Sequence, residues 1–145
     1  MNVQSILGRK GTDVATIRQD ASLADAAAAL RDRGVGALVV SPDGSTIHGI
    51  ISERDIVRAL ANHGATALGR TVGSTMSAAV TTCGSGDALE QLMAQMTEHR
   101  IRHVPVVDER GTLGGIISIG DVVKSRLGQL QQDNQALADY LYQGR

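Results

Sequence analysis

The chain of 145 residues has no tryptophan or phenylalanine, and its two tyrosines, Tyr140 and Tyr142, both lie near the C-terminus. A module that stacks exposed bases on aromatic rings, as many RNA-binding domains do, therefore has no platform here. Lys and Arg number 14 against 15 Asp and Glu, which gives a net charge of -1 and no basic excess for holding phosphate backbones. We expect no nucleic-acid partner.

Cysteine is almost as scarce as the aromatic residues. Cys83 is the only one, so the chain can form no internal disulfide and offers no zinc cluster, which fits a reducing compartment. No apolar run approaches the ~18 residues that a membrane helix needs, and the start of the chain has no secretory signal pattern. We expect a cytoplasmic protein with no membrane partner and no required metal or cofactor.

An internal repeat is the strongest signal in the sequence. The segment GIISERD at Gly49–Asp55 returns as GIISIGD at Gly115–Asp121. The same offset places residues 14–58 on residues 80–124 without a gap. The two copies therefore predict two versions of one supersecondary unit, related by a pseudo-two-fold axis.

Each copy predicts the element order β-α-β-β-α, and the fold class is mixed α/β (α+β). A strand that is apolar throughout is covered on both faces, and the serine before each final helix is a typical N-cap. In the first copy we expect strands at Val14–Ile17, Ala37–Val40 and Ile47–Ile51, with helices that open at Ser22 and Ser52. In the second copy the strands are Val80–Cys83, Val104–Val107 and Leu113–Ile117, with helices that open at Gly86-Asp87 and Ser118.

Neither copy is large enough to bury its helix faces alone, so we expect the two to pack as one unit. We place the first repeat with its N-terminal segment at residues 1–66, the second repeat at 67–126 and a helical tail at 127–145. The tail carries a coiled-coil-like 3-4-3-4 stripe that consists of Leu127, Leu130, Asn134, Leu137 and Leu141. Because two heptads are too few to be stable alone, we expect this helix to dock on its own or a neighbouring protomer.

Two repeats that each end in a strand, Ser-x-x-Asp and a helix resemble the tandem cystathionine-β-synthase (CBS) domain pair, also called a Bateman module. The segments that carry the resemblance are GIISERDIV (49–57), GIISIGDVV (115–123) and HRIRHVPVVDERG (99–111). It covers residues 1 to about 126 and leaves no room for a catalytic domain. The resemblance implies a ligand-sensing module that forms a homodimer, a flat disc of four repeats.

The motifs Ser52-x-x-Asp55 and Ser118-x-x-Asp121 have two interpretations. Each is a capping box by spacing, in which serine and aspartate satisfy free N–H groups of the first helical turn. Each also opens a helix N-terminus at a sheet edge, where N–H groups and the helix dipole favour an anion. In the family that the chain resembles, these residues contact the phosphate and ribose of adenosyl ligands. We favour ligand contact, most of all for the second copy.

Arg102 and His103 begin a predicted strand, and the resemblance places basic residues of this segment beside the ligand phosphate. Their equivalents in the first copy, Gly36 and Ala37, cannot neutralise phosphate charge. The two sites are therefore unequal. One of them binds weakly, binds a different ligand, or uses Arg102 across the pseudo-dyad.

A further set of residues completes the candidate nucleotide site. Arg54 is a candidate to bind a second phosphate group. The other residues of this set are expected to line the cleft where adenine binds. With no aromatic rings nearby, the base must be held by aliphatic packing and backbone hydrogen bonds. These further candidates are Thr16, Thr82, Ala37, Val104, Pro105 and Ile117.

We therefore expect a stand-alone regulatory module that binds AMP, ADP, ATP, NAD or a related adenosyl compound between the repeats. It would signal through its own oligomer or through an unidentified partner protein. The first alternative is a structural dimerisation module with empty pockets. The second is an enzyme, which we disfavour because no set of nucleophile, base and orienting group is visible.

Overall fold

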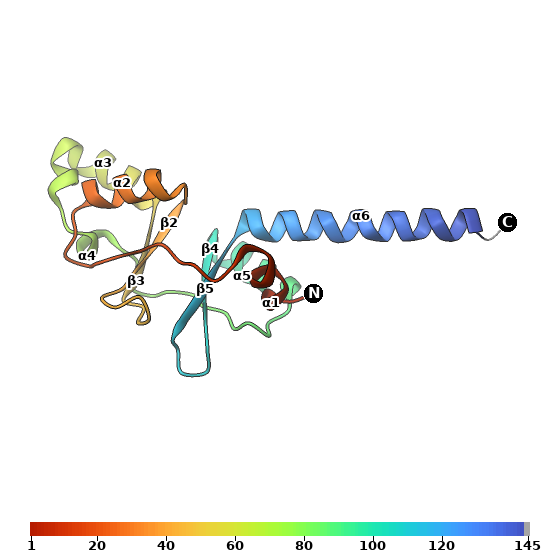
Figure 1. Ribbon diagram of the computed structural model, residues 1–145. Helices are drawn as coiled ribbons and strands as arrows, with labels where there is room; N and C mark the ends of the chain where they lie inside the picture. The colour runs from red at the N-terminus through yellow and green to blue at the C-terminus, as the bar shows by residue number, and fades with distance from the viewer. Residues whose placement is uncertain (144–145) are drawn as a thin grey trace.

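The computed structural model describes residues 1–143 and contains the repeat as two units, each built on a pair of antiparallel strands (Figure 1). The first unit forms a three-stranded sheet in the order β1-β2-β3, with β1 parallel to β2 and β2 antiparallel to β3. Its elements are β1 (Thr16–Ile17), α2 (Leu23–Arg33), β2 (Ala37–Val40), β3 (Gly49–Ser52) and α3 (Glu53–His63).

The second unit has a two-stranded sheet whose antiparallel pair repeats the register of β2 and β3. Its elements are α5 (Leu89–His99), β4 (His103–Val107), β5 (Leu113–Ser118) and α6 (Ile119–Gln143). Ala37 lies opposite Ser52 in the first strand pair, and His103 lies opposite Ser118 in the second. The equivalence of these pairs agrees with the sequence repeat. Both motif serines end a strand as predicted, although each strand is buried only at alternate residues.

The strand predicted at Val80–Cys83 is absent, and the prediction is wrong there. In the first unit the N–H of Val39 donates to the carbonyl of Ala15 at 3.0 Å, which ties β1 to β2. The residue equivalent to Val39 is Pro105, which has no N–H to donate. Only an isolated parallel bridge from Cys83 to Val106 remains of this strand.

The two predicted helix starts before the central strands differ in outcome. Ser22 caps α2 with a complete capping box, as predicted. In the second unit the helix begins at Leu89, later than the predicted Gly86-Asp87, because the Asp87 carboxylate accepts from the N–H of Gly84 at 2.9 Å instead of capping the helix. The N–H of Leu89 donates to the carbonyl of Met1, so the N-terminal segment closes this helix end.

Each core is completed by the segment that precedes the other unit in the sequence. Helix α1 (Val3–Lys10) buries Val3, Ile6 and Leu7 against the second unit (Figure 1). The linker between the units holds the 3-10 helix η1 (Gly64–Gly69) and α4 (Val72–Thr75), which bury residues in the core of the first unit. The two units are therefore interlocked.

The tail is the C-terminal part of α6, which runs without a break over 25 residues and projects away from both units (Figure 1). Leu127, Leu130, Leu137 and Leu141 are 46–61% exposed, so this part of the helix does not dock on its own protomer. Docking on a neighbouring protomer stays a prediction. Among residues 1–143, no helix is both long and apolar enough to cross a bilayer.

We predict that Leu7→Ala lowers the free energy of unfolding by about 2–5 kcal/mol, because Leu7 is 5% exposed in the second core. Urea denaturation measures this change. Gln4→Ala on the exposed side of the same helix is the control, and its effect should stay within about 0.5 kcal/mol. Equal effects of the two substitutions would show that α1 does not contribute to that core.

Candidate functional site

A cleft of about 500 Å³ opens between the two units at the N-terminus of α3. One wall comes from the first unit and the other from the segment between α5 and β4, together with Ser77 of the linker. The lining residues are Gly36, Ala37, Ile50, Ser52, Glu53, Arg54, Asp55, Arg58, Ser77, His99, Arg100, Ile101, Arg102 and His103. Four of the predicted site residues in the first copy, and two in the second, meet at this one place.

Ser52 and Asp55 form a complete capping box at the mouth of the cleft. The Asp55 carboxylate oxygen Oδ2 accepts from the backbone N–H of Ser52 at 2.8 Å and from its hydroxyl at 3.1 Å. The N–H of Asp55 donates to Ser52 Oγ at 3.4 Å. Within residues 1–143 Oδ1 of Asp55 has no hydrogen-bond partner, so the carboxylate keeps an acceptor that can face a ligand.

The cleft carries more positive than negative charge. Arg54 and Arg58 reach it from α3, and Arg100 and Arg102 reach it from the opposite wall. In the described part of the chain, none of these four arginines is within ion-pairing distance of a carboxylate. Guanidinium groups that are not committed to protein carboxylates suit a bound phosphate, because their planar forks of donors match its oxygens.

Arg100 was missed by the sequence reasoning, although the repeat holds a signal for it. It ends α5 in the left-handed conformation at φ 53°, the position at which Gly34 ends α2 at φ 63°. A non-glycine residue is disfavoured there by about 1–2 kcal/mol. An arginine at a position that favours glycine, at the edge of a cleft, indicates a role for its side chain.

His103 lies between the two units. A Cβ atom on Gly36 would come within 3.1 Å of the His103 ring and 2.8 Å of Glu53 Oε1, so a side chain at position 36 would displace both groups. Burial lowers the pKa of His103, although the charge of Glu53 acts to raise it; Lys10 and Arg102 lower it and Asp121 raises it. The net direction is downward, so the imidazole is neutral at pH 7 and the arginines carry the positive charge.

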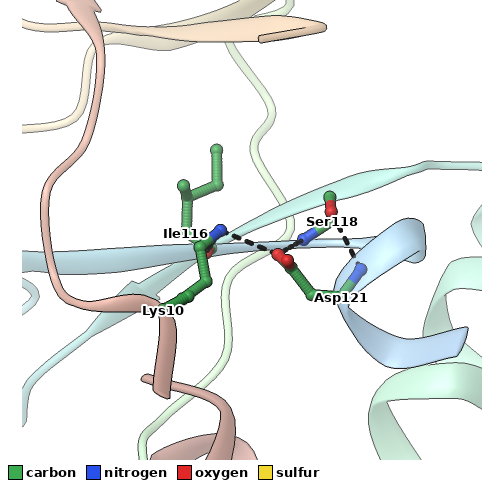
Figure 2. A network of polar contacts seen from close by, with 4 residues as sticks. All are labelled: Lys10, Ile116, Ser118 and Asp121. Atoms are coloured by element: carbon green, nitrogen blue, oxygen red, sulfur yellow. Dashed lines mark hydrogen bonds and ion pairs between the residues drawn. The ribbon is translucent and has the colours of Figure 1, made fainter. Parts of the chain in front are cut away.

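The second motif is engaged inside the protein. Asp121 Oδ2 accepts from the N–H of Ser118 at 2.9 Å, and the N–H of Asp121 donates to Ser118 Oγ at 3.1 Å. Lys10, the last residue of α1, places its ammonium 2.7 Å from the same carboxylate oxygen and 2.9 Å from the carbonyl of Ile116 (Figure 2). The second motif, which the sequence favours as the ligand site, therefore has an internal cation at its aspartate, and whether it binds a ligand stays a prediction.

The remaining predicted contacts lie outside the cleft. Val104 and Ile117 are fully buried in the core of the second unit, and Pro105 is buried beside them, so their side chains cannot reach a ligand in this arrangement. Thr16 is exposed on β1 and faces the hollow beside the turn after β2. Thr82 is half-buried and precedes the isolated bridge at Cys83. The aliphatic side chains that do line the cleft are Ile50, Ala37 and Ile101.

The chemistry of Cys83 and the acidic residues offers no second kind of site. Cys83 is buried, and burial, together with the charge of Asp87, raises the pKa of its thiol to about 11. A thiol of this kind is inert at neutral pH. No cluster of His, Cys, Asp or Glu with metal-ligating geometry occurs among residues 1–143.

Comparison with known proteins identifies the family. The sequence matches the CBS domain over residues 7–62 and again over residues 72–128. These matches cover more than half of the chain, so the protein belongs to the CBS-domain family and carries two CBS domains in tandem. The chain spans 62% of the length of a curated relative with which it shares 33% identity over 129 residues.

Solved structures confirm the fold. The CBS-domain containing protein ATU1752 from Agrobacterium tumefaciens shares 45% sequence identity at a TM-score of 0.82, over 86% of this chain and 98% of that chain. CBS domain protein PAE2072 from Pyrobaculum aerophilum, complexed with AMP, shares 26% sequence identity at a TM-score of 0.75, and the match covers 83% of this chain and 89% of that chain. The CBS domain pair of protein MJ0100 was solved in complex with methylthioadenosine and S-adenosyl-L-methionine. It shares 25% sequence identity at a TM-score of 0.79, and the match covers 89% of this chain and 98% of that chain.

We predict that His103 makes the protein less stable in mild acid. Because its pKa is lowered in the folded state, the unfolded chain takes up a proton as the pH falls below about 6.5, before the folded protein does. The free energy of unfolding therefore falls between about pH 6.5 and the lowered pKa of His103. Below that pKa the loss due to His103 stays constant. Urea unfolding at pH 7.5 and 5.5 should show a smaller loss in His103→Gln than in the wild type. The same loss in both would contradict a buried neutral imidazole.

Proposed function

We propose that this CBS pair is a regulatory module that binds an adenosyl nucleotide in the cleft at the N-terminus of α3. The observation that carries the proposal is the group of four arginines around the Ser52 and Asp55 motif, none of which forms an ion pair with a carboxylate among residues 1–143. The helix N-terminus adds its dipole to this positive charge. The proposal is further supported by the AMP bound to one similar structure.

Each group in the cleft has a role that its chemistry suits. Asp55 accepts hydrogen bonds from the ribose hydroxyls through its free oxygen, which distinguishes a nucleoside from inorganic phosphate. The hydroxyl of Ser52 would exchange its hydrogen bond to Asp55 for one to phosphate, and Arg102 neutralises the phosphate charge across the cleft. Arg54, Arg58 and Arg100 provide further positive charge for a second or third phosphate, as in ADP, ATP or NAD.

The charge of the cleft also discriminates among adenosyl ligands. S-adenosyl-L-methionine, which one similar structure binds, carries a positively charged sulfonium group. Four arginines repel that charge and attract phosphate, so we infer that the ligand is one of the anionic nucleotides. No nucleophile–base pair occurs in the described part of the cleft. We therefore propose that the protein regulates a partner protein in the cytoplasm and does not catalyse a reaction.

A homodimer is part of the same proposal. Val57 and Leu60 of α3, and Ile119 and Val123 of α6, are 38–63% exposed. They lie on the helices that follow the two motifs, on a surface that is apolar in both units. Two copies that bury these helix faces against each other would form the four-repeat disc that the family resemblance implies. Ligand binding at the start of α3 would then reach the interface through that helix.

We predict that AMP stabilises the folded protein, since the cleft exists only in the native state. At about 100 times its dissociation constant, AMP should add about 2.7 kcal/mol to the free energy of unfolding. Asp55→Ala should weaken AMP binding roughly 10- to 150-fold, the equivalent of about 1.5–3 kcal/mol for a hydrogen bond to an ionised group. Thermal denaturation and calorimetry measure the two effects.

Asp121→Ala is the matched control, because it removes the equivalent capping aspartate at the other motif. Both variants lose about 1 kcal/mol of capping energy, and Asp121→Ala also loses the ion pair with Lys10, but only Asp55→Ala should lose affinity. If millimolar AMP, ADP, ATP and NAD all leave the melting temperature of the wild type unchanged, the chain is a structural module and the nucleotide proposal fails.

We predict that Arg102→Ala costs more affinity for AMP than for adenosine, because only AMP carries the charge that arginine neutralises. The difference should shrink as salt rises, since the exposed Arg102 side chain is screened. Calorimetry of both ligands against wild type and variant gives the two ratios. Arg110→Ala, at the far end of the same hairpin, is the control. Equal losses for AMP and adenosine would mean that Arg102 does not contact phosphate.

A further inference from the structure

The side chain of Lys10 occupies the second motif from within the chain. Its ammonium makes two short contacts, to Asp121 Oδ2 at 2.7 Å and to the carbonyl of Ile116 at 2.9 Å (Figure 2). The side chains of Lys10 and Asp121 are 31% and 24% exposed, so the pair is only partly screened by solvent. A ligand hydroxyl that approached this carboxylate would meet a group that Lys10 already pairs through Oδ2.

The first unit has no such cation at its motif. The repeat places Lys10 on Met76, which lies so close to Gly49 that a Cβ there would come within 2.7 Å of the methionine sulfur. The carbonyl of Ile50 accepts from the backbone N–H of Ser77 at 2.9 Å. The two units therefore satisfy the same strand carbonyl differently, and only the second does so with a charged side chain.

Lys10 also changes the electrostatics of Asp121. Burial raises the pKa of this carboxyl, but the hydrogen bond from Lys10, the bonds from Ser118 and the Lys10 charge outweigh it and hold the pKa below its ordinary value. Asp121 is thus ionised and already neutralised by a partner. A ribose that bound there would have to replace a charge-assisted hydrogen bond with neutral ones, which are weaker.

The wall opposite the second motif does not provide the arginines that could offset the loss of the Lys10 hydrogen bond. By the repeat, the places that Arg100 and Arg102 occupy in the first cleft belong to Gly34 and Gly36. Neither glycine can bind phosphate through a side chain. A nucleotide at the second motif would therefore have to displace Lys10 without the arginines that the first cleft provides.

We propose that Lys10 is a specificity-determining residue that closes the second motif, so that each chain binds a single nucleotide, in the first cleft. The inference rests on the proposed function. Replacement of Lys10 frees the Asp121 carboxylate for a ribose. Because Gly34 and Gly36 stand in place of the two arginines, the freed site takes an uncharged nucleoside in preference to a nucleotide.

Calorimetric titration of the full chain with AMP and with adenosine tests this assignment. Wild type should bind one molecule of either ligand per chain. Lys10→Met, which installs the residue of the equivalent position in the first unit, should bind a second adenosine. The direction is diagnostic, since removal of a cation is expected to create a binding site. If Lys10 instead bound phosphate, Lys10→Met would lower the affinity for AMP and would create no second site. This result would overturn the proposal.

Two controls and a second variant complete the experiment. Lys10→Arg keeps the charge and Arg9→Met removes the neighbouring charge of α1, and both should keep a single site. Lys10→Gln replaces Lys10→Met if the latter does not melt cooperatively. Two sites in wild type, or one site in both neutral variants, would refute the role of Lys10. If wild type binds neither ligand, the nucleotide proposal fails, whereas adenosine binding by Lys10→Met alone would still support the closure of the second motif.

Discussion

Helix α1 buries Val3, Ile6 and Leu7 in the core of the second unit, although it precedes the first unit in the sequence. The linker between the units does the reverse and completes the core of the first unit through Ala67 and Val72. Each unit therefore needs a segment from across the pseudo-dyad to bury its apolar face. This exchange holds the two strand pairs side by side, and the cleft between them depends on it.

The same exchange makes the two motifs unequal. Because α1 ends beside β5, its last residue reaches Asp121 and the carbonyl of Ile116. The equivalent stretch of the linker ends in Met76 and Ser77, and within residues 1–143 Asp55 has no salt-bridge partner. On the opposite wall the second unit offers Arg100 and Arg102, where the first has Gly34 and Gly36. Two differences at equivalent positions thus favour the first cleft for an anion.

Both motifs are also helix caps, so structural and binding roles are not alternatives here. Oδ2 of each aspartate accepts from the N–H of its own serine. The Asp55 carboxylate has no further partner residue within residues 1–143, whereas Asp121 is also paired with Lys10. A capping box fixes the rotamers of serine and aspartate before a ligand arrives. Such preorganisation lowers the conformational entropy lost on binding, and it lets one pair of side chains stabilise the helix and orient a ribose.

The sequence alone determined the repeat, the β-α-β-β-α order and both Ser-x-x-Asp motifs, because these depend on local patterns of apolar residues, turns and caps. It did not determine that no strand forms at Val80–Cys83. The reason, that Pro105 has no N–H to donate, is visible once the two copies are aligned. Only the tertiary structure decided which motif faces the arginines and which faces Lys10. Lys10 and Asp121 are 111 residues apart, and no local pattern in the sequence relates residues that meet only when α1 packs on the distant unit.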